Sequence, residues 1–391
     1  MKIYIIFRNP FPYGMAPSQH VTCEALGLKS AGAEVEVVVF VPPLDKDKDN
    51  GLPAKGEFRN ISYDYIHGKF RPSNLVGQVA NRFYNTIRTF FWGLRHFRKD
   101  DIVYSYGGDN LTLMLLTWAA HLKRSKIAVE LVEIPFYGTG KIDRIRRWFD
   151  TTFLFPHFDA FVCISHSLLV FAKKYARPNT PMHLLPILVE ENEVQSFGAP
   201  PYNVPYIIHT GTMTEQKDGI SHILKGFAKF KNKDKTGCRL VFTGPHANID
   251  TCKYKATIKK LGIEDYVDLL GLVDTREDLI ELQHHASMSI VYKVENIQTQ
   301  YCFATKIGEV LMAGIPLITT NIGEQKYYLT NNENAYIVNN DEELAKVIES
   351  VLIHNENAKQ IGQKGKEVAM TDFSPTIQGK KLYDFFLDIN N

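Results

Sequence analysis

Residues 1–40 read MKIYIIFRNPFPYGMAPSQHVTCEALGLKSAGAEVEVVVF. Two short apolar runs, Ile3–Phe7 and Val35–Phe40, are typical of buried strands. Between them, the loop Arg8–Pro17 leads into a helical stretch that starts near Ser18, a residue able to cap it, and stops at Gly32. A strand, a helix and a second strand in this order predict a βαβ unit with parallel strands.

The same alternation continues along the chain and predicts an α/β protein with parallel sheets. The further strand-like runs are Ile102–Tyr104, Ile127–Val132, Ala160–Ile164, Tyr206–Ile208, Leu240–Thr243, Val267–Leu270, Met288–Tyr292 and Pro316–Thr320. A stretch rich in proline and glycine, Ser196–Pro205, interrupts the alternation, which restarts at Tyr206. We therefore expect two Rossmann-like domains, residues 1–200 and 201–373.

The amino-acid composition limits the classes of function to be considered. The 391 residues are 45% hydrophobic with a net charge of +2, ordinary for a globular protein, so nothing global predicts nucleic-acid binding. Five scattered cysteines without CxxC spacing favour a reducing compartment over disulfides or a zinc site. We see neither a signal peptide nor an apolar run of membrane-spanning length, and we expect a cytoplasmic protein.

Loops that follow strands and precede helices are where parallel sheets bind ligands. Two such loops are Asn9–Ser18, which contains Gly14, and Gly211–Gly219, which begins Gly211-Thr212 and contains Lys217. The second could hold a diphosphate through its amides, hydroxyls and lysine. A third loop, Leu269–Asp274, could read a nucleobase edge. Taken singly, each is equally well explained as a structural turn or a solvated loop.

The segment Phe303-Ala304-Thr305-Lys306-Ile307-Gly308-Glu309-Val310-Leu311-Met312-Ala313-Gly314-Ile315-Pro316 is more informative. Thr305 could cap a helix that Gly314 and Pro316 end. Lys306 and Glu309 would then share a face near the helix N-terminus, where free amides and a lysine attract phosphate and a glutamate can accept hydrogen bonds from ribose hydroxyls. A surface Lys–Glu pair is the alternative.

In their order, these segments resemble the retaining family-4 glycosyltransferases of GT-B fold. Three stretches carry the likeness: Gly211–Lys217 is similar to the pyrophosphate loop of that family, Leu270–Ala286 to its LGxV segment, and Phe303–Gly314 to its donor helix. The resemblance implies an α/β, GT-B fold of two Rossmann-like domains facing across a cleft. It also implies that a C-terminal helix, 374–391, packs back on the N-terminal domain.

The resemblance also assigns roles. Glu309 would bind the donor ribose, and Lys217 would stabilise the departing diphosphate as a catalytic residue. The N-domain loop facing the donor would contribute Gly14. Other donor-binding positions are Gly211, Thr212, Gly244, Leu272, Phe303, Ala304, Thr305 and Lys306, of which Gly244 and Leu272 would lie near the base.

Three positions depart from the family pattern. Tyr301 stands where many members carry a second glutamate, and Met213 or a neighbour stands where an arginine often precedes the lysine. The N-domain histidine of many members is not visible after the strand at Ile127–Val132. Glu133 and Tyr137 occupy that neighbourhood, and either a catalytic role for Glu133 or a core or hinge role fits.

The implied reaction moves a sugar from a nucleoside diphosphate-sugar to a saccharide or lipid-linked saccharide, in surface polysaccharide or glycan biosynthesis. Charge develops on the leaving diphosphate, and preorganised amides with Lys217 would stabilise it. We therefore expect no metal and no cofactor beyond the nucleotide-sugar co-substrate. A nucleotide-sugar epimerase and a degenerate, non-catalytic binding subunit are the rival interpretations.

A stretch of the N-terminal half points to the acceptor. Along 78–99, apolar residues recur at helical spacing among basic ones, and a second basic cluster follows at 141–147. Helices of this kind lie on anionic membrane surfaces, so the protein could be peripheral at the inner face of a membrane and meet a lipid-linked acceptor there. A helix packed on the sheet with a solvated basic face is the alternative.

Overall fold

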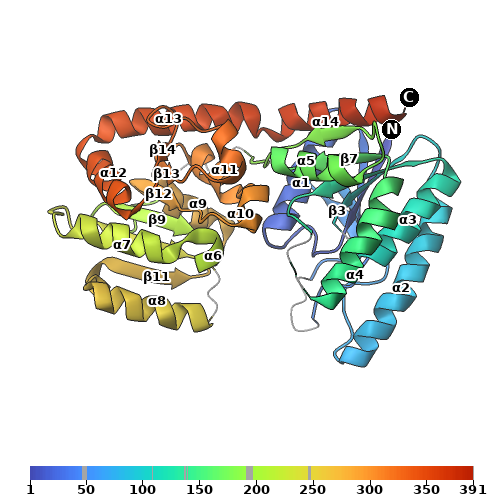
Figure 1. Ribbon diagram of the computed structural model, residues 1–391, viewed down its shortest axis with the longest axis horizontal. Helices are drawn as coiled ribbons and strands as arrows, with labels where there is room; N and C mark the ends of the chain where they lie inside the picture. Colours follow the sequence, from blue (N-terminus) through green and yellow to red (C-terminus); the bar gives the residue numbers. More distant parts are fainter. Residues whose placement is uncertain are drawn as a thin grey trace. The chain divides into compact units, whose positions relative to one another are not determined.

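A computed structural model describes residues 1–45, 51–107, 109–135, 138, 140–190, 197–244 and 248–390 of the chain. The chain divides into two compact units (Figure 1): unit 1 comprises Met1–Leu188 with Ser374–Asn391, and unit 2 comprises Val189–Phe373. The sequence placed the division between 200 and 201, in the segment rich in proline and glycine, whereas the structure places it at Leu188 and Val189.

Unit 1 is built on an eight-stranded sheet, counted over the described residues, with strand order β3-β4-β2-β1-β5-β6-β7-β8. All neighbouring pairs are parallel except β3 and β4. The strands are β1 (Lys2–Phe7), β2 (Glu34–Val39), β3 (Lys55–Phe58), β4 (Ile61–Tyr65), β5 (Ile102–Tyr106), β6 (Lys126–Leu131), β7 (Ala160–Cys163) and β8 (Met182–Leu184). The central strands are buried on both faces, as parallel sheets covered by helices require.

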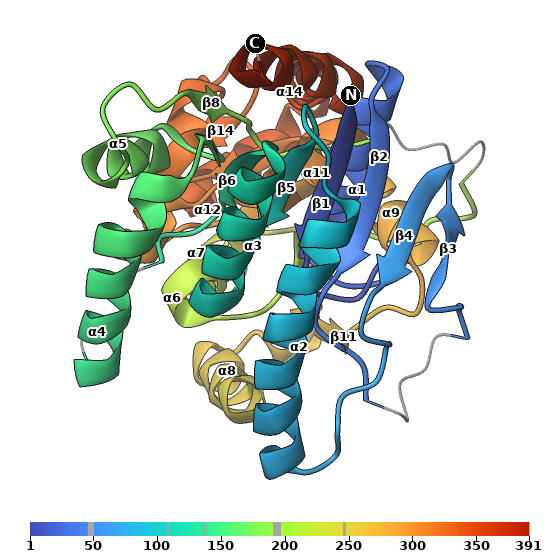
Figure 2. The ribbon, with the colours of Figure 1, turned by 90° about the vertical axis from the view of Figure 1, so that its right-hand side faces the viewer.

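The helices of unit 1 surround this sheet. They are α1 (Ala16–Ser30), α2 (Leu75–His96), α3 (Asn110–Lys123), α4 (Lys141–Phe149), α5 (His166–Tyr175) and α14 (Pro375–Asn390). Helices α2 and α3 lie side by side (Figure 2). No helix among the described residues is long and apolar enough to cross a membrane.

The C-terminal helix α14 packs against α1 at a glycine crossing. A Cβ atom on Gly27 would lie 2.2 Å from the Pro375 carbonyl oxygen, and one on Gly379 would lie 2.3 Å from the Gly27 carbonyl carbon. Two backbones can approach this closely only without side chains. Leu382 and Phe386 of α14 are fully buried in the core of unit 1, so this helix is part of that unit.

Unit 2 contains a parallel, six-stranded sheet with strand order β11-β10-β9-β12-β13-β14 over its described residues. The strands are β9 (Tyr206–Thr210), β10 (Arg239–Thr243), β11 (Val267–Gly271), β12 (Met288–Val291), β13 (Leu317–Thr319) and β14 (Tyr336–Ile337). The order reverses at β9, where the chain first runs outward to β11 and then crosses to β12. Parallel sheets bind ligands at such a switch point.

Two groups of helices flank this sheet: α7 packs against α8 and α12, and α11 packs against α9 and α13. The helices of unit 2 are α6 (Glu215–Asp218), α7 (Ile220–Lys231), α8 (Asn248–Leu261), α9 (Arg276–His284), α10 (Ile297–Tyr301), α11 (Thr305–Ala313), α12 (Asp341–Ile353) and α13 (Asn355–Asp372). Ile220, Ile223, Leu224 and Phe227 of α7 are all fully buried, as their helical spacing predicts.

Two predicted helix caps are wrong. Helix α1 begins at Ala16 with Met15 at the N-cap, so Ser18 lies inside the first turn and its hydroxyl donates to the Pro10 carbonyl oxygen at 2.6 Å. Helix α11 begins at Thr305 itself, with Ala304 at the N-cap and no side-chain cap. In both cases the helix starts too early for the predicted hydroxyl to reach a free amide, while Gly314 ends α11 in the left-handed conformation as predicted.

Candidate functional site

Three glycines meet at the carboxyl ends of neighbouring strands in unit 2. The Gly211 amide donates to the Thr243 carbonyl oxygen at 2.9 Å, and the Gly244 amide donates to the Gly271 carbonyl oxygen at 2.7 Å. Gly244 has φ +131° and a Cβ there would lie 2.3 Å from the Gly211 carbonyl oxygen. Backbone, not side chain, therefore forms the floor at the ends of β9, β10 and β11, which lets a ligand approach the sheet closely.

A buried ion network lies beside this floor. Asp218, at the end of α6, accepts from the Lys306 ammonium group at 2.6 Å and from the Lys293 ammonium group at 3.2 Å, in each case through Oδ1. A Cβ on Gly211 would lie 3.0 Å from the Nζ atom of Lys306, so this lysine sits directly over the first glycine. Two lysines share one carboxylate, which leaves the network with an excess positive charge.

The pKa values of these groups reflect that excess. Burial and the charge of Lys293 lower the pKa of Lys306 to about 8, against the opposing charge of Asp218. Burial would raise the pKa of Asp218, but the two lysines hold it well below its usual range. Burial and the charge of Lys306 lower the pKa of His209 to about 3, so this buried imidazole is neutral at pH 7. The network is thus poised to attract an anion.

Helix α11 presents Glu309 one turn after Lys306. Its half-buried carboxylate forms no hydrogen bond within the part of the chain that the structure describes. Burial raises the pKa of Glu309, while the charges of Arg276 and Lys306 act in the opposite direction. Because the N-cap Ala304 offers no side-chain acceptor, the first amides of α11 are open to an anion as well. Groups that can bind an anion and a carboxylate that can accept hydrogen bonds from hydroxyls thus lie on adjacent turns of α11.

The other residues of unit 2 that were predicted for this site differ in their exposure to solvent. Lys217 is half-exposed in α6, directly before Asp218, while Thr212 and Leu272 are exposed in the loops after β9 and β11. Phe303 is buried, with its ring stacked on Tyr328 at 5.4 Å between centroids, so its side chain belongs to the core and only its backbone could touch a ligand.

Some of the predicted residues belong to unit 1. Gly14 is needed for a tight turn: a Cβ there would lie 2.1 Å from the Ser18 hydroxyl oxygen. Glu133 is exposed in the loop after β6. Tyr137 lies outside the described residues. Gly14 and Glu133 belong to unit 1, whereas the glycine floor and the ion network belong to unit 2.

Unit 1 contains a buried triad that was not predicted from the sequence. His20 Nε2 lies 2.8 Å from Glu130 Oε1 and 3.5 Å from Glu24 Oε1, and all three side chains are almost fully buried. Within the described parts of the chain, neither Glu24 Oε2 nor Glu130 Oε2 has a hydrogen-bond partner. The spacing of His20 and Glu24, one helical turn apart, was a signal, but their pairing with Glu130 is set by tertiary structure.

The charges of the triad depend on one another. Burial alone would lower the pKa of His20, but the charges of Glu130 and Glu24 outweigh burial and raise it to about 10. Burial and the charge of Glu24 raise the pKa of Glu130. The imidazolium is therefore the cation that compensates two carboxylates inside an apolar core.

Substitution of His20 by alanine should expose this dependence. At pH 8 we expect a loss of about 3–5 kcal/mol in the free energy of unfolding, because two buried carboxylates lose their cation. The raised carboxyl pKa means that the folded variant binds protons more tightly than the unfolded chain, so acidification from pH 8 to pH 6 should raise the variant's own free energy of unfolding. Denaturant titrations at both pH values measure this.

The control for this experiment is His157→Ala, at an exposed position of the same unit, which should change stability little. The wild-type contribution of His20 should persist below its ordinary pKa and disappear as the pH rises through about 10. A His20→Ala protein as stable as the wild type at pH 8 would contradict the charge assignment.

Part of the sequence is similar to known proteins. Residues 191–368 match the family Glycosyl transferases group 1. Over 181 residues the chain is 27% identical to trehalose synthase of Pyrococcus horikoshii, an alignment that covers 44% of this chain and 40% of that protein. The chain therefore spans less than half the length of that relative.

Three solved structures match nearly the whole chain. HepE of Anabaena in complex with UDP superposes with a TM-score of 0.73 at 13% identity, covering 99% of this chain and 100% of that one. For sucrose-phosphate synthase of Thermosynechococcus elongatus the TM-score is 0.72 at 12% identity, covering 99% and 98%. A glycosyltransferase of Rickettsia africae gives 0.71 at 16% identity, covering 99% and 98%.

At these identities the structural likeness shows the fold, and the sequence match concerns residues 191–368. The matched segment contains the three glycines, the Lys293–Asp218–Lys306 network and Glu309 described above. The chain has the GT-B fold of two Rossmann-like units, and its residues 191–368 match the family Glycosyl transferases group 1.

Proposed function

We propose that the protein is a glycosyltransferase that moves a sugar from a nucleoside diphosphate-sugar to a saccharide or lipid-linked saccharide, with retention of the anomeric configuration. The observation that carries the proposal is the positively charged network of Lys293, Asp218 and Lys306 over the glycine floor of unit 2. Its excess charge fits a diphosphate, and Glu309 one turn further along α11 fits the ribose.

The proposed roles of the residues follow from the negative charge that grows on the leaving diphosphate. As the glycosidic bond to the diphosphate breaks, negative charge grows on the leaving oxygen. Lys306, the first amides of α11 and Lys217 of α6 would stabilise it, and Asp218 would hold Lys306 in place. Fixed cations and amides of this kind can do the work of a divalent metal, so we propose a metal-independent reaction.

Relatives support the donor class. HepE of Anabaena has been solved with UDP and with UDP-glucose, and we propose a donor of the same chemical class here. Surface polysaccharide or glycan synthesis in the cytoplasm is the setting that we propose, since it supplies both a nucleotide-sugar and a saccharide acceptor.

A turnover assay tests the proposal. The purified protein is incubated with a panel of nucleotide-sugars with and without EDTA, and products are followed by NMR. We expect slow donor hydrolysis to nucleoside diphosphate and free sugar, first released as the donor's anomer, and no loss of rate with EDTA. A new sugar isomer still attached to the nucleotide would instead identify an epimerase, and binding without turnover a non-catalytic subunit.

We also propose that unit 1 docks on an anionic membrane surface through α2. Its apolar stripe faces outward: Val79 is 64% exposed, and Phe83 and Phe91 are each 62% exposed. Arg82 and Arg88 lie along the same helix, and Ile145 and Trp148 of α4 are exposed as well among further basic residues. Apolar residues for the acyl boundary and cations for the headgroups make a membrane-binding helix.

Vesicle sedimentation should show this association. We expect binding to anionic vesicles that weakens with salt, because each basic residue near the surface contributes about 1 kcal/mol. Phe83→Asp should reduce binding strongly, whereas Ile353→Asp, at an equally exposed apolar position in unit 2, should leave it unchanged. Equal sedimentation with neutral and anionic vesicles at low salt would remove the membrane proposal.

A further inference from the structure

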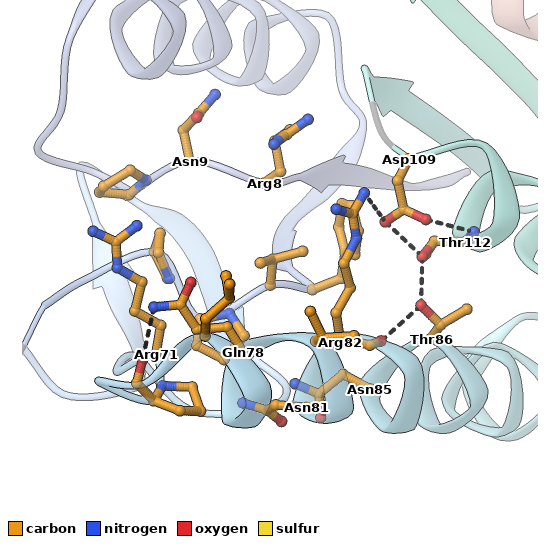
Figure 3. A pocket seen from close by; sticks show the side chains of 18 residues that line it. Arg8, Asn9, Arg71, Gln78, Asn81, Arg82, Asn85, Thr86, Asp109 and Thr112 are labelled. Carbon is orange, nitrogen blue, oxygen red and sulfur yellow. Dashed lines mark hydrogen bonds and ion pairs between the residues drawn. The ribbon is translucent and has the colours of Figure 1, made fainter. Parts of the chain in front are cut away.

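Unit 1 contains a cavity of about 420 Å³ that the donor site does not use (Figure 3). Its walls are the loops after β1 and β2, the N-terminal half of α2 and the start of α3. The loops follow the carboxyl ends of parallel strands, the edge at which such sheets bind ligands. The cavity is therefore placed where unit 1 should receive a small molecule.

Positive charge dominates the lining. Among the described residues that line the cavity, Arg8, Arg71 and Arg82 face one carboxylate, Asp109. Figure 3 shows Arg71 and Arg82 reaching from the side of α2 toward the chain that carries Arg8. A guanidinium presents two parallel donors that match phosphate oxygens, so three arginines around one cavity select an anion with phosphate geometry.

Two of these arginines have a carboxylate partner. Arg82 forms an ion pair with Asp109 in which Nη2 lies 3.8 Å from Oδ2, beyond hydrogen-bonding distance. Asp109 is instead committed to the N-terminus of α3, where it accepts from the Thr112 amide at 3.1 Å and from the Thr112 hydroxyl at 2.9 Å. Arg71 forms two hydrogen bonds to Asp45, at 2.5 and 2.6 Å, which hold its guanidinium at the cavity wall.

Carboxamide side chains in the cavity can bind hydroxyl groups of a ligand. Asn9, Gln78, Asn81 and Asn85 line the cavity beside the arginines. Gln78 donates to the Pro72 carbonyl oxygen at 2.9 Å, which orients its side chain. Side-chain amides both donate and accept, as hydroxyl groups require. The lining therefore suits an anion that also carries hydroxyls, such as a sugar phosphate.

The mouth of the cavity is apolar and continuous with the outer surface of α2. Leu75 and Val79 line the cavity, and both are largely exposed. The same face of α2 continues through the exposed Phe83 and Phe91. A ligand whose head occupies the cavity would thus leave it along an apolar stripe, which suits an amphiphile rather than a free sugar phosphate.

We propose that this cavity binds the phosphate-bearing head of a lipid-linked saccharide acceptor, with Arg71 and Arg82 on the phosphate, the carboxamides on the sugar and the lipid tail along α2. The inference rests on the proposed function, whose acceptor it specifies. The chemistry is that of a phosphate ester between a sugar and a lipid, with one or two phosphates.

The test uses three probes: farnesyl diphosphate, which has a lipid tail and a diphosphate head, inorganic pyrophosphate and farnesol. Binding is measured by calorimetry below the aggregation concentration of the lipids, with the donor site saturated by a nucleoside diphosphate that the protein binds. We expect farnesyl diphosphate to bind at least about tenfold more tightly than either of the others. Arg71→Gln and Arg82→Gln should each weaken it about tenfold or more, since each removes a charge-assisted contact.

The matched control is Arg95→Gln, which makes the same change on the same helix at a residue that does not line the cavity. It should alter binding less than about twofold. All three arginines are exposed, so the variants should fold. Equal weakening by Arg95→Gln and Arg82→Gln, unchanged binding in Arg82→Gln, or equal affinity for pyrophosphate and farnesyl diphosphate would each overturn the proposal.

The two proposals fail separately. If no nucleoside diphosphate binds, the proposed function fails, and the titration without nucleotide still decides whether the cavity selects an amphiphilic phosphate. The other case is that nucleoside diphosphates bind the wild type and Arg82→Gln normally, and farnesyl diphosphate binds both proteins with equal affinity. Only the acceptor inference then fails.

Discussion

Replacement of Glu309 by alanine is expected to weaken binding of the nucleoside diphosphate about 100-fold or more. The carboxylate would accept two hydrogen bonds from ribose hydroxyls, each worth roughly 1.5–3 kcal/mol to a charged acceptor. The described residues offer the carboxylate no hydrogen bond of their own, so its removal should cost binding rather than folding. Calorimetric titration of wild type and variant with the same nucleotide measures the change.

Two further variants sharpen this experiment. Glu309→Gln retains a neutral acceptor and should lie between wild type and alanine. Glu356→Ala removes an exposed glutamate of α13 in the same unit and should leave nucleotide affinity unchanged. A folded Glu309→Ala protein with wild-type nucleotide affinity would eliminate the proposed ribose contact.

Replacement of Lys217 by alanine is expected to slow turnover about 100-fold while weakening donor binding less than about tenfold. The reason is that charge on the diphosphate grows toward the transition state, so a cation aimed at the leaving group acts more on kcat than on binding. Separate measurement of donor affinity and of single-turnover rate distinguishes the two effects.

The control for Lys217 is Lys225→Ala, at an exposed position of α7, which should leave both quantities near wild type. If Lys217→Ala loses affinity and rate in equal proportion, the lysine binds the ground state and the transition state alike, and its catalytic role is wrong.

Much of the fold could be predicted from the sequence. All ten predicted strands occur, because buried parallel strands are nearly continuous apolar runs. Four further strands, β3, β4, β8 and β14, were missed. Their signals are weak: β3 reads Lys-Gly-Glu-Phe at the edge of its sheet, and β14 has two residues. An edge strand needs no apolar run because one side of it faces solvent.

The sequence was sufficient to predict several residues of the candidate site, but not the ion pairs that they form. Lys306 and Glu309 were found as neighbours on one helix, whereas the true partner of Lys306 is Asp218, which lies 88 residues away. Asp218 directly follows Lys217, yet local spacing cannot show that two lysines converge on it. Likewise His20 and Glu24 are one turn apart, but only the packing of α1 on β6 adds Glu130.

The most direct test of the central claim is a crystal structure of the protein with the nucleoside diphosphate that binds best. We predict that the diphosphate lies over Gly211 within hydrogen-bonding distance of Lys306 and the first amides of α11. We also predict that both ribose hydroxyls donate to Glu309, with no metal ion on the phosphates. A nucleotide bound elsewhere in the protein, or one whose phosphates contact neither Gly211 nor Lys306, would contradict it.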